Sequence, residues 1–126
     1  MRFHPNGKLA FVLTEMGCTV LSFRYDAQAG TLELIDEANA LPEELREVVI
    51  GASEIQIHPN GKFLYAALRG HDSIAAFTIN STTGKLTFVE REPVRGSHPR
   101  HFNLDPTGKW LLAADRDSNT IAVFRI

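Results

Sequence analysis

The sequence predicts an all-β fold, a partial β-propeller made of four-stranded antiparallel blades. One strand–turn–strand pattern occurs three times, with its turns at residues 4–8, 58–62 and 105–109. In each copy a phenylalanine follows the first turn residue by 19 positions. Copies that recur every ~40–50 residues are typical of arrays whose units stack to bury a core. Helical repeats are not expected, because these segments lack apolar residues spaced by three and four.

Each element of the unit has its own sequence signal. The turn sequence x-Pro-Asn/Thr-Gly-Lys combines a proline that presets φ with a glycine that accepts the left-handed conformation. Apolar or alternating segments then predict a second and a third strand, and a further glycine turn precedes a fourth. We expect second strands at 9–14, 63–68 and 110–114, third strands at 20–25, 74–79 and 121–126, and fourth strands at 32–35 and 86–89. Phe11, Phe63 and Trp110 are expected in the blade core.

The chain is expected to form one partial propeller domain over residues 1–126, with units of about 1–52, 53–99 and 100–126. Residues 36–53 lengthen the first unit, and apolar side chains at 41, 45, 48 and 49 predict a short helix or an ordered loop there. A solvated acidic insertion and a cover over a site both fit this segment. Propellers close with about four to eight blades. We therefore expect a fragment of a longer protein, or a chain that completes its ring by self-association through open blade edges.

Composition argues against several classes of function. The 126 residues are 44% hydrophobic and 22% charged, as in globular proteins. A net charge of −2 gives no general attraction to nucleic acid or to an anionic membrane. Apolar runs are too short for a membrane span, and the first residues lack the apolar core of a secretory signal. The single cysteine, Cys18, excludes an internal disulfide and fits a reducing compartment, so we expect the cytoplasm.

Charged residues gather where the expected topology brings strand ends together. In a propeller blade the inner strand starts at the rim where the second strand ends. The residues expected at this rim are Glu15, Arg69 and Arg116, which end second strands, and Glu54, Arg100 and His101, which lie at the starts of inner strands. They could form a site for an anionic, oxygen-rich small molecule, in which arginines bind oxygens in bidentate fashion. They could equally be solvent-exposed loop charges.

Histidines and the remaining motifs add less. His71 lies beside Arg69 and is a weaker candidate, because the residues after it are ordinary turn formers. His4 and His58 precede the turn prolines at the opposite rim and are expected to be structural. The sequence lacks zinc-ligand spacing, a phosphate-binding glycine loop, a dinucleotide fingerprint and a serine elbow. We therefore expect neither a metal nor an organic cofactor.

Longer runs resemble a known family. They include Arg69-Gly70-His71-Asp72-Ser73, Pro99-Arg100-His101-Phe102 and the segments 57–65, 83–86, 105–114 and 117–118. Together they resemble the cycloisomerase-type lactonases, which are seven-bladed propellers, over essentially the whole chain. The resemblance implies a sugar-lactone hydrolase similar to the family's 6-phosphogluconolactonases, which convert 6-phosphogluconolactone to 6-phosphogluconate in the pentose phosphate pathway. A muconate-type lactonising enzyme and a non-catalytic binding scaffold stay open as alternatives.

The resemblance also assigns roles to residues. The family's site at the channel mouth uses arginines, a glutamate and a histidine, of which the glutamate matches Glu15 and one arginine matches Arg69. It implies that Glu15 acts as, or orients, the general base, and that Arg69 stabilises the oxyanion, with Arg100 as a further ligand of the anionic substrate. The other substrate-binding candidates are His101, His71, Glu54 and Arg116. The family's second arginine and its histidine would precede Met1.

Overall fold

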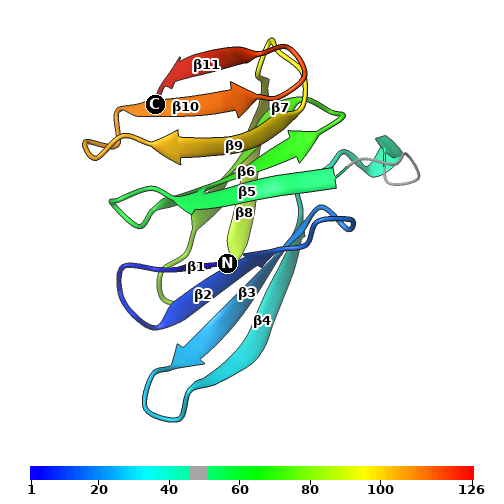
Figure 1. Cartoon of the computed structure of the whole chain (residues 1–126). Coiled ribbons are helices and arrows are strands. Elements are labelled where there is room, and N and C mark those ends of the chain that lie inside the picture. The colour runs from blue at the N-terminus through cyan, green and yellow to red at the C-terminus, as the bar shows by residue number, and fades with distance from the viewer. Residues whose placement is uncertain (46–50) are drawn as a thin grey trace.

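The computed structural model describes residues 1–45 and 51–126, and it consists of three antiparallel sheets that follow one another in chain order (Figure 1). The first sheet contains β1 (Arg2–Phe3), β2 (Leu9–Leu13), β3 (Thr19–Asp26) and β4 (Thr31–Asn39). The second contains β5 (Gly51–Ile57), β6 (Phe63–Arg69), β7 (Ser73–Ile79) and β8 (Leu86–Pro93). The third contains β9 (Pro99–Leu104), β10 (Trp110–Asp115) and β11 (Thr120–Arg125). Within each sheet every strand pairs with the next along the chain, and the predicted all-β partial propeller is confirmed.

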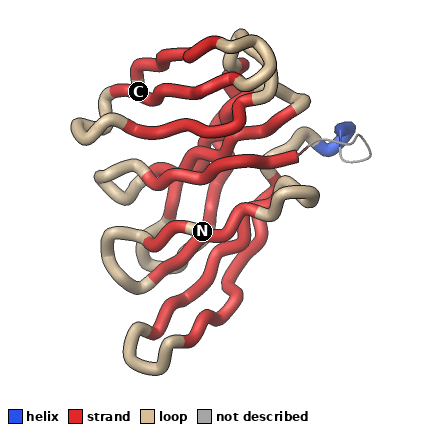
Figure 2. Tube along the Cα trace, in the orientation of Figure 1, coloured by secondary structure: helices blue, strands red, loops and turns tan. Residues whose placement is uncertain are grey.

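The turns between the first two strands of each sheet lie along one rim of the stack, at the left of Figure 2. Gly7, Gly61 and Gly108 occupy equivalent places in these turns, with φ of 70°, 72° and 71°. A residue with a Cβ is strained in this left-handed region, so glycine is the fitting residue there. The chain therefore reverses sharply at this rim, and the second strand returns to the opposite rim.

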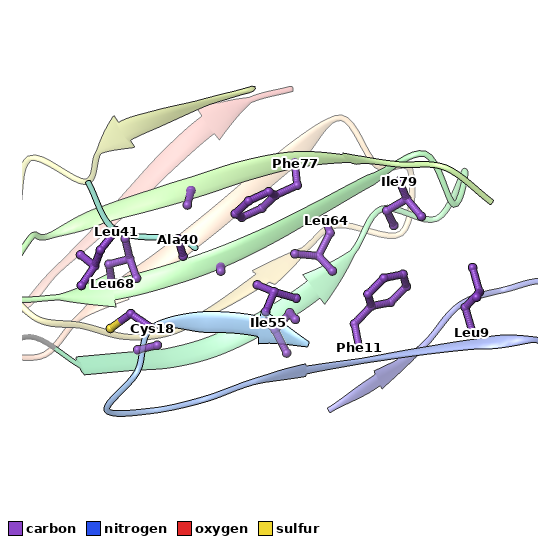
Figure 3. Close-up of a cluster of buried hydrophobic side chains, with 14 residues drawn as sticks. Leu9, Phe11, Cys18, Ala40, Leu41, Ile55, Leu64, Leu68, Phe77 and Ile79 are labelled. Atoms are coloured by element: carbon purple, nitrogen blue, oxygen red, sulfur yellow. The ribbon is translucent and has the colours of Figure 1, made fainter. Parts of the chain in front are cut away.

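The core consists of two apolar layers, one on each face of the second sheet. Figure 3 shows the larger layer, in which Phe11 and Val20 of the first sheet pack against Leu64 and Phe77 of the second. The smaller layer joins the second and third sheets through the side chains of Tyr65, Ala67, Ile74, Phe102 and Leu111. Alternate residues of β6 belong to the two layers, as the two-residue period of a strand requires. The second sheet is thus covered on both faces along β5, β6 and β7, whereas its outer strand β8 is mostly exposed.

Trp110 does not lie in the core, contrary to the expectation from the sequence. Phe11 is fully buried and Phe63 is half-buried, whereas Trp110 is 44% exposed. Trp110 is exposed because it lies on the face of β10 that is turned away from the second sheet. Leu111 and Ala113 point toward the second sheet, so Trp110 and Leu112 point away from it, where no other described element packs.

The outer strands are longer than the sequence suggests. β4 continues to Asn39 and β8 to Pro93, beyond the expected ends at residues 35 and 89. Each pairing contains a register shift, between Ser22 and Phe23 in β3 and between Ala76 and Phe77 in β7. The ladder resumes past each irregularity, as it does at a β-bulge. Of the helix or loop expected near residues 42–49, the structure shows a 3₁₀ turn, η1 (Glu43–Leu45); the remainder lies outside the described residues.

Candidate functional site

Glu15 and Arg69 form an ion pair across two sheets at the rim opposite the glycine turns. The Oε1 atom of Glu15, just after β2, accepts a hydrogen bond from Nη2 of Arg69, the last residue of β6. The same Nη2 donates to the carbonyl oxygen of Ala52 in β5 at 2.9 Å. The backbone nitrogen of Ala52 in turn donates to the carbonyl oxygen of Glu15 at 2.8 Å. Three strands are thus connected around one guanidinium.

A glycine makes room for this arginine. The guanidinium of Arg69 lies against Gly51, where an added Cβ would collide with it. The Arg69 side chain is only 18% exposed, whereas that of Glu15 is 66% exposed. The buried thiol of Cys18 lies next to them, 3.6 Å from the carbonyl oxygen of Glu15. Burial raises the pKa of the Cys18 thiol, although the nearby charge of Arg69 opposes that shift. The arginine is therefore held in place, while the carboxylate stays accessible.

A polar pocket of about 230 Å³ opens beside this pair. It is lined by Leu13, Glu15, Ala52, Ser53 and Arg100. Arg100 is exposed, and the structure shows no ion pair for it among residues 1–45 and 51–126. The pocket therefore combines a paired carboxylate with an unpaired guanidinium, an arrangement suited to an anionic, oxygen-rich molecule.

Glu54 and His101 form a second group on the inner strands. The Oε2 atom of Glu54 lies 2.9 Å from Nδ1 of His101. The other carboxylate oxygen of Glu54 accepts a hydrogen bond from Arg2 at 3.1 Å. The sequence predicts that Glu54 and His101, at equivalent positions of neighbouring units, lie at the same rim. The contact of Arg2 with Glu54 was not predicted from the sequence. Arg2 is two residues away from the position in the first unit that is equivalent to Glu54 and His101. Only the two-residue period of a strand, which puts such residues on the same face, could have indicated this contact.

The other two candidate residues, Arg116 and His71, contact residues outside the pocket. Arg116 is exposed and donates through Nε to Oδ1 of the adjacent Asp117 at 2.6 Å. This contact raises the pKa of Arg116 and lowers that of Asp117. The Nδ1 atom of His71 lies 2.7 Å from Oγ of the buried Ser73. Neither Arg116 nor His71 lines the pocket that contains Glu15 and Arg100.

The larger hollows of the surface lie between β8 and β11. One, of about 420 Å³, is lined mainly by apolar and blade-facing side chains such as Phe63, Tyr65 and Phe124. The other, of about 610 Å³, follows the edge of β11. Both are gaps between the second and third sheets, and neither is lined by Glu15 or Arg69. The larger hollow also has charged residues in its lining, namely Glu90, Glu92, Arg95 and Arg125. Among the residues that the structure describes, no group of three or more His, Cys, Asp or Glu side chains is placed to hold a metal ion. No helix in this part of the chain has the length and apolar character needed to cross a membrane.

Comparison with known proteins gives a consistent result. The family model described as "Lactonase, 7-bladed beta-propeller" matches residues 1–126. A 6-phosphogluconolactonase from Bacillus subtilis is 38% identical over 122 residues, which are 97% of this chain and 35% of that protein. A 6-phosphogluconolactonase from Formosa agariphila is 39% identical over 125 residues, 98% of this chain and 34% of that protein. The chain thus spans about a third of the length of these relatives.

Solved structures agree with these matches. The periplasmic gluconolactonase of Pseudomonas aeruginosa superposes with a TM-score of 0.91 at 29% identity. The superposition covers 98% of this chain and 34% of the gluconolactonase chain.

Proposed function

Because this chain belongs to the seven-bladed β-propeller lactonase family, we propose that the protein containing it hydrolyses a sugar lactone. The names of its relatives favour 6-phosphogluconolactone as the substrate and 6-phosphogluconate as the product. The chain covers about a third of those relatives, so the activity is proposed for the whole protein.

One observation supports the proposal most directly, namely the pocket in which the unpaired Arg100 lies near the Glu15–Arg69 pair. Hydrolysis of a phosphorylated lactone needs a cation to bind the anionic group, a base to activate water, and a donor for the oxyanion that forms. These three residues offer one group for each task. A scaffold without activity would more simply have Glu15 and Arg69 apart in solvent, and they are paired.

In the proposed reaction, Arg100 binds the anionic substituent of the lactone. Glu15 accepts a proton from water or orients it, and the water oxygen attacks the ester carbonyl carbon. Negative charge moves to the carbonyl oxygen, where Arg69 stabilises it from a position that is already fixed by Ala52. The tetrahedral intermediate then collapses and the bond from the carbonyl carbon to the ring oxygen breaks. That oxygen takes the proton that Glu15 accepted from water and leaves as a hydroxyl, which returns Glu15 to its carboxylate form. No step in this scheme requires a cofactor.

The remaining candidates receive smaller roles in this proposal. His71 and Arg116 would contact substrate only after leaving their present partners, Ser73 and Asp117. We propose the cytoplasm as the compartment, since the single thiol is free and buried, although the Pseudomonas aeruginosa neighbour is named as periplasmic. Fractionation of cells that express the tagged full-length protein would decide between the two compartments.

Mutation of the Glu15–Arg69 pair in the full-length protein tests the function. Glu15→Gln and Arg69→Ala are each expected to lower the turnover of 6-phosphogluconolactone by about 100-fold or more, because the first removes the base and the second the oxyanion donor. The rate is measured as acid released over the spontaneous background. Glu33→Gln and Arg24→Ala are matched controls, since these residues form an exposed pair 3.9 Å apart on outer strands.

The outcomes separate the alternatives. Wild-type rates in both Glu15→Gln and Arg69→Ala would reject the role assignment. Activity on a muconate-type dicarboxylate in place of the lactone would favour the lactonising reaction. Binding of sugar phosphates without turnover of either substrate would favour a scaffold.

A further inference from the structure

Side-chain contacts connect the inner strands β1, β5 and β9, which belong to different sheets and share no backbone ladder. Arg2 of β1 donates through Nη2 to Oε1 of Glu54 at 3.1 Å, and through Nε to the carbonyl oxygen of Ile55 at 3.0 Å. Oε2 of Glu54 lies 2.9 Å from Nδ1 of His101 on β9. β5 lies between β1 and β9 (Figure 1). Glu54 is therefore the central member of a connection across three sheets.

Arg100 lies at an irregularity of β9. Pro99 and His101 pair with consecutive residues of β10, so Arg100 between them has no partner in that ladder. A β-bulge of this kind leaves the extra residue without ladder bonds and changes the direction of its side chain. The position of Arg100 then depends on what holds the residues on either side of it.

Two consecutive residues of β5 hold these neighbours. The hydroxyl of Ser53 donates to the carbonyl oxygen of Pro99 at 2.6 Å. Glu54 binds His101, as described above. Ser53 and Glu54 themselves lie at a register shift of β5, between Ala52 and Ile55. Arg100 is thus anchored on both sides by the neighbouring sheet, next to the pocket that it lines.

Both carboxylate oxygens of Glu54 have partners within the protein. Oε1 accepts from the backbone nitrogen of Ile55 at 2.8 Å in addition to Arg2, and Oε2 lies 2.9 Å from Nδ1 of His101. The Glu54 side chain is 17% exposed, compared with 66% for Glu15. Its contacts are therefore with the protein, whereas Glu15 is open to the pocket.

We propose that Glu54, supported by Arg2 and Ser53, is a positioning residue that fixes the place of Arg100 in the pocket. Glu54 and His101 then act through Arg100 and do not touch substrate. This inference rests on the proposed function in one respect, because that function supplies the identity of the anion that Arg100 binds. Its structural part, the anchoring of the 99–101 segment, can be measured without any catalysis.

A double-mutant cycle in the full-length protein tests the link to Arg100. The probe is 6-phosphogluconate, whose dissociation constant is measured by calorimetry for wild type, Glu54→Ala, Arg100→Ala and the double variant. Glu54→Ala is expected to weaken binding about 10-fold, because a misplaced binding group loses most of its contribution. The double variant should bind no more weakly than Arg100→Ala alone. Additive losses would overturn the proposal, since Glu54 would then act independently of Arg100.

Hydrogen exchange provides the readout that is independent of ligand and turnover. Glu54→Ala should increase exchange at the backbone amides of His101 and Phe102, while Glu33→Gln should leave them unchanged. Glu54→Gln serves as the conservative variant. Its amide oxygen can accept from Arg2 and its amide nitrogen can face His101, so exchange and affinity should return to within about 3-fold of wild type.

The results are separable from those for the activity. Unchanged exchange in Glu54→Ala would overturn the positioning role whatever the enzyme does. Failure of the wild type to hydrolyse the lactone would reject the proposed function alone, and exchange would still decide the role of Glu54.

Discussion

The imidazole Nε2 of His4 lies 2.7 Å from the carbonyl oxygen of Gly61, so the glycine turn of the first sheet is hydrogen-bonded to that of the second. Nδ1 of the same ring accepts from the backbone nitrogen of Asn6 at 3.1 Å, which leaves Nε2 as the donor. His58 repeats the arrangement with the carbonyl oxygen of Gly108, at 2.8 Å. These contacts agree with the structural role expected for both histidines.

This contact predicts different costs for equivalent glycine substitutions. Gly7 and Gly61 share the left-handed conformation, but a Cβ at Gly7 has no heavy atom within 4 Å, whereas one at Gly61 would lie 2.9 Å from Nε2 of His4. Gly7→Ala should therefore cost about 1 kcal/mol of unfolding free energy from backbone strain alone. Gly61→Ala should cost about 1–2 kcal/mol more because of the collision.

Urea unfolding of the two variants measures the difference. Adding His4→Ala to Gly61→Ala should remove the collision, so the two substitutions should cost less together than the sum of the single ones. Equal losses of unfolding free energy in Gly7→Ala and Gly61→Ala would show that the His4 ring moves away from the added methyl group without an energetic cost.

Asp115 predicts a pH-dependent stability. Its side chain is buried, Oδ2 accepts a hydrogen bond from Thr120 at 3.3 Å, and Oδ1 has no partner among the described residues. Burial raises the pKa of this carboxyl above 3.8, and the charge of Asp72 adds to the rise, while Thr120 opposes it. A raised pKa in the folded state means that the contribution of Asp115 is favourable below pH ~4 and is lost as the pH rises through the folded pKa.

Asp115→Asn removes the loss of stability that ionisation of Asp115 causes, because an asparagine side chain carries no charge at any of these pH values. The variant should gain about 1 kcal/mol of unfolding free energy over wild type at pH 7, and the gain should shrink toward pH 4. Urea unfolding at several pH values is the measurement, with Asp36→Asn as the control. A variant that is less stable than wild type at pH 7 would mean that the carboxylate has stabilising contacts in solution.

The open faces of the first and third sheets predict self-association of the 126-residue chain produced alone. On the third sheet the exposed apolar side chains are Trp110, Leu112, Ile121 and Val123. On the first sheet Leu32 and Leu34 are 43% and 57% exposed. Clusters of exposed apolar residues of this kind mark surfaces that bind other protein.

Light scattering after size exclusion measures the mass of this chain. We expect a mass above the 14.0 kDa of the monomer, and a lower mass after Val123→Lys, which places a charge on the apolar face. Thr82→Lys, in an exposed turn, is the control. A monodisperse monomer would contradict the prediction and show that these apolar faces stay exposed to solvent.

The sequence predicts the strands and turns well, because each depends on local residues. Proline and glycine mark the turns, and alternation marks the strands, so the strands expected at 63–68 and 74–79 agree closely with β6 and β7. The extended ends of β4 and β8 were missed, because the bulges that allow pairing to continue have no strong local signal. Trp110 was placed wrongly because its burial depends on a neighbouring sheet and not on its own strand.

The site could be predicted only as a set of positions. Equivalent spacing indicated that Glu15, Arg69 and Arg116 lie at one rim, but not that the first two pair while Arg116 binds Asp117. Side-chain pairing depends on reach and on competing partners, which spacing does not encode. Arg2 is not at an equivalent position, and so its contact with Glu54 required the structure.

The contacts of His4 with Gly61 and of His58 with Gly108 connect neighbouring glycine turns, and these turns lie at the rim opposite the pocket. Under the proposed function, substitutions at the pocket rim would change the reaction while these turn contacts stay intact. A designer who wants a new substrate has freedom at the strand ends around Glu15 and Arg100, because the histidine turns can be kept as a fixed frame. The same separation would let related propellers exchange the residues of one rim and inherit the other unchanged.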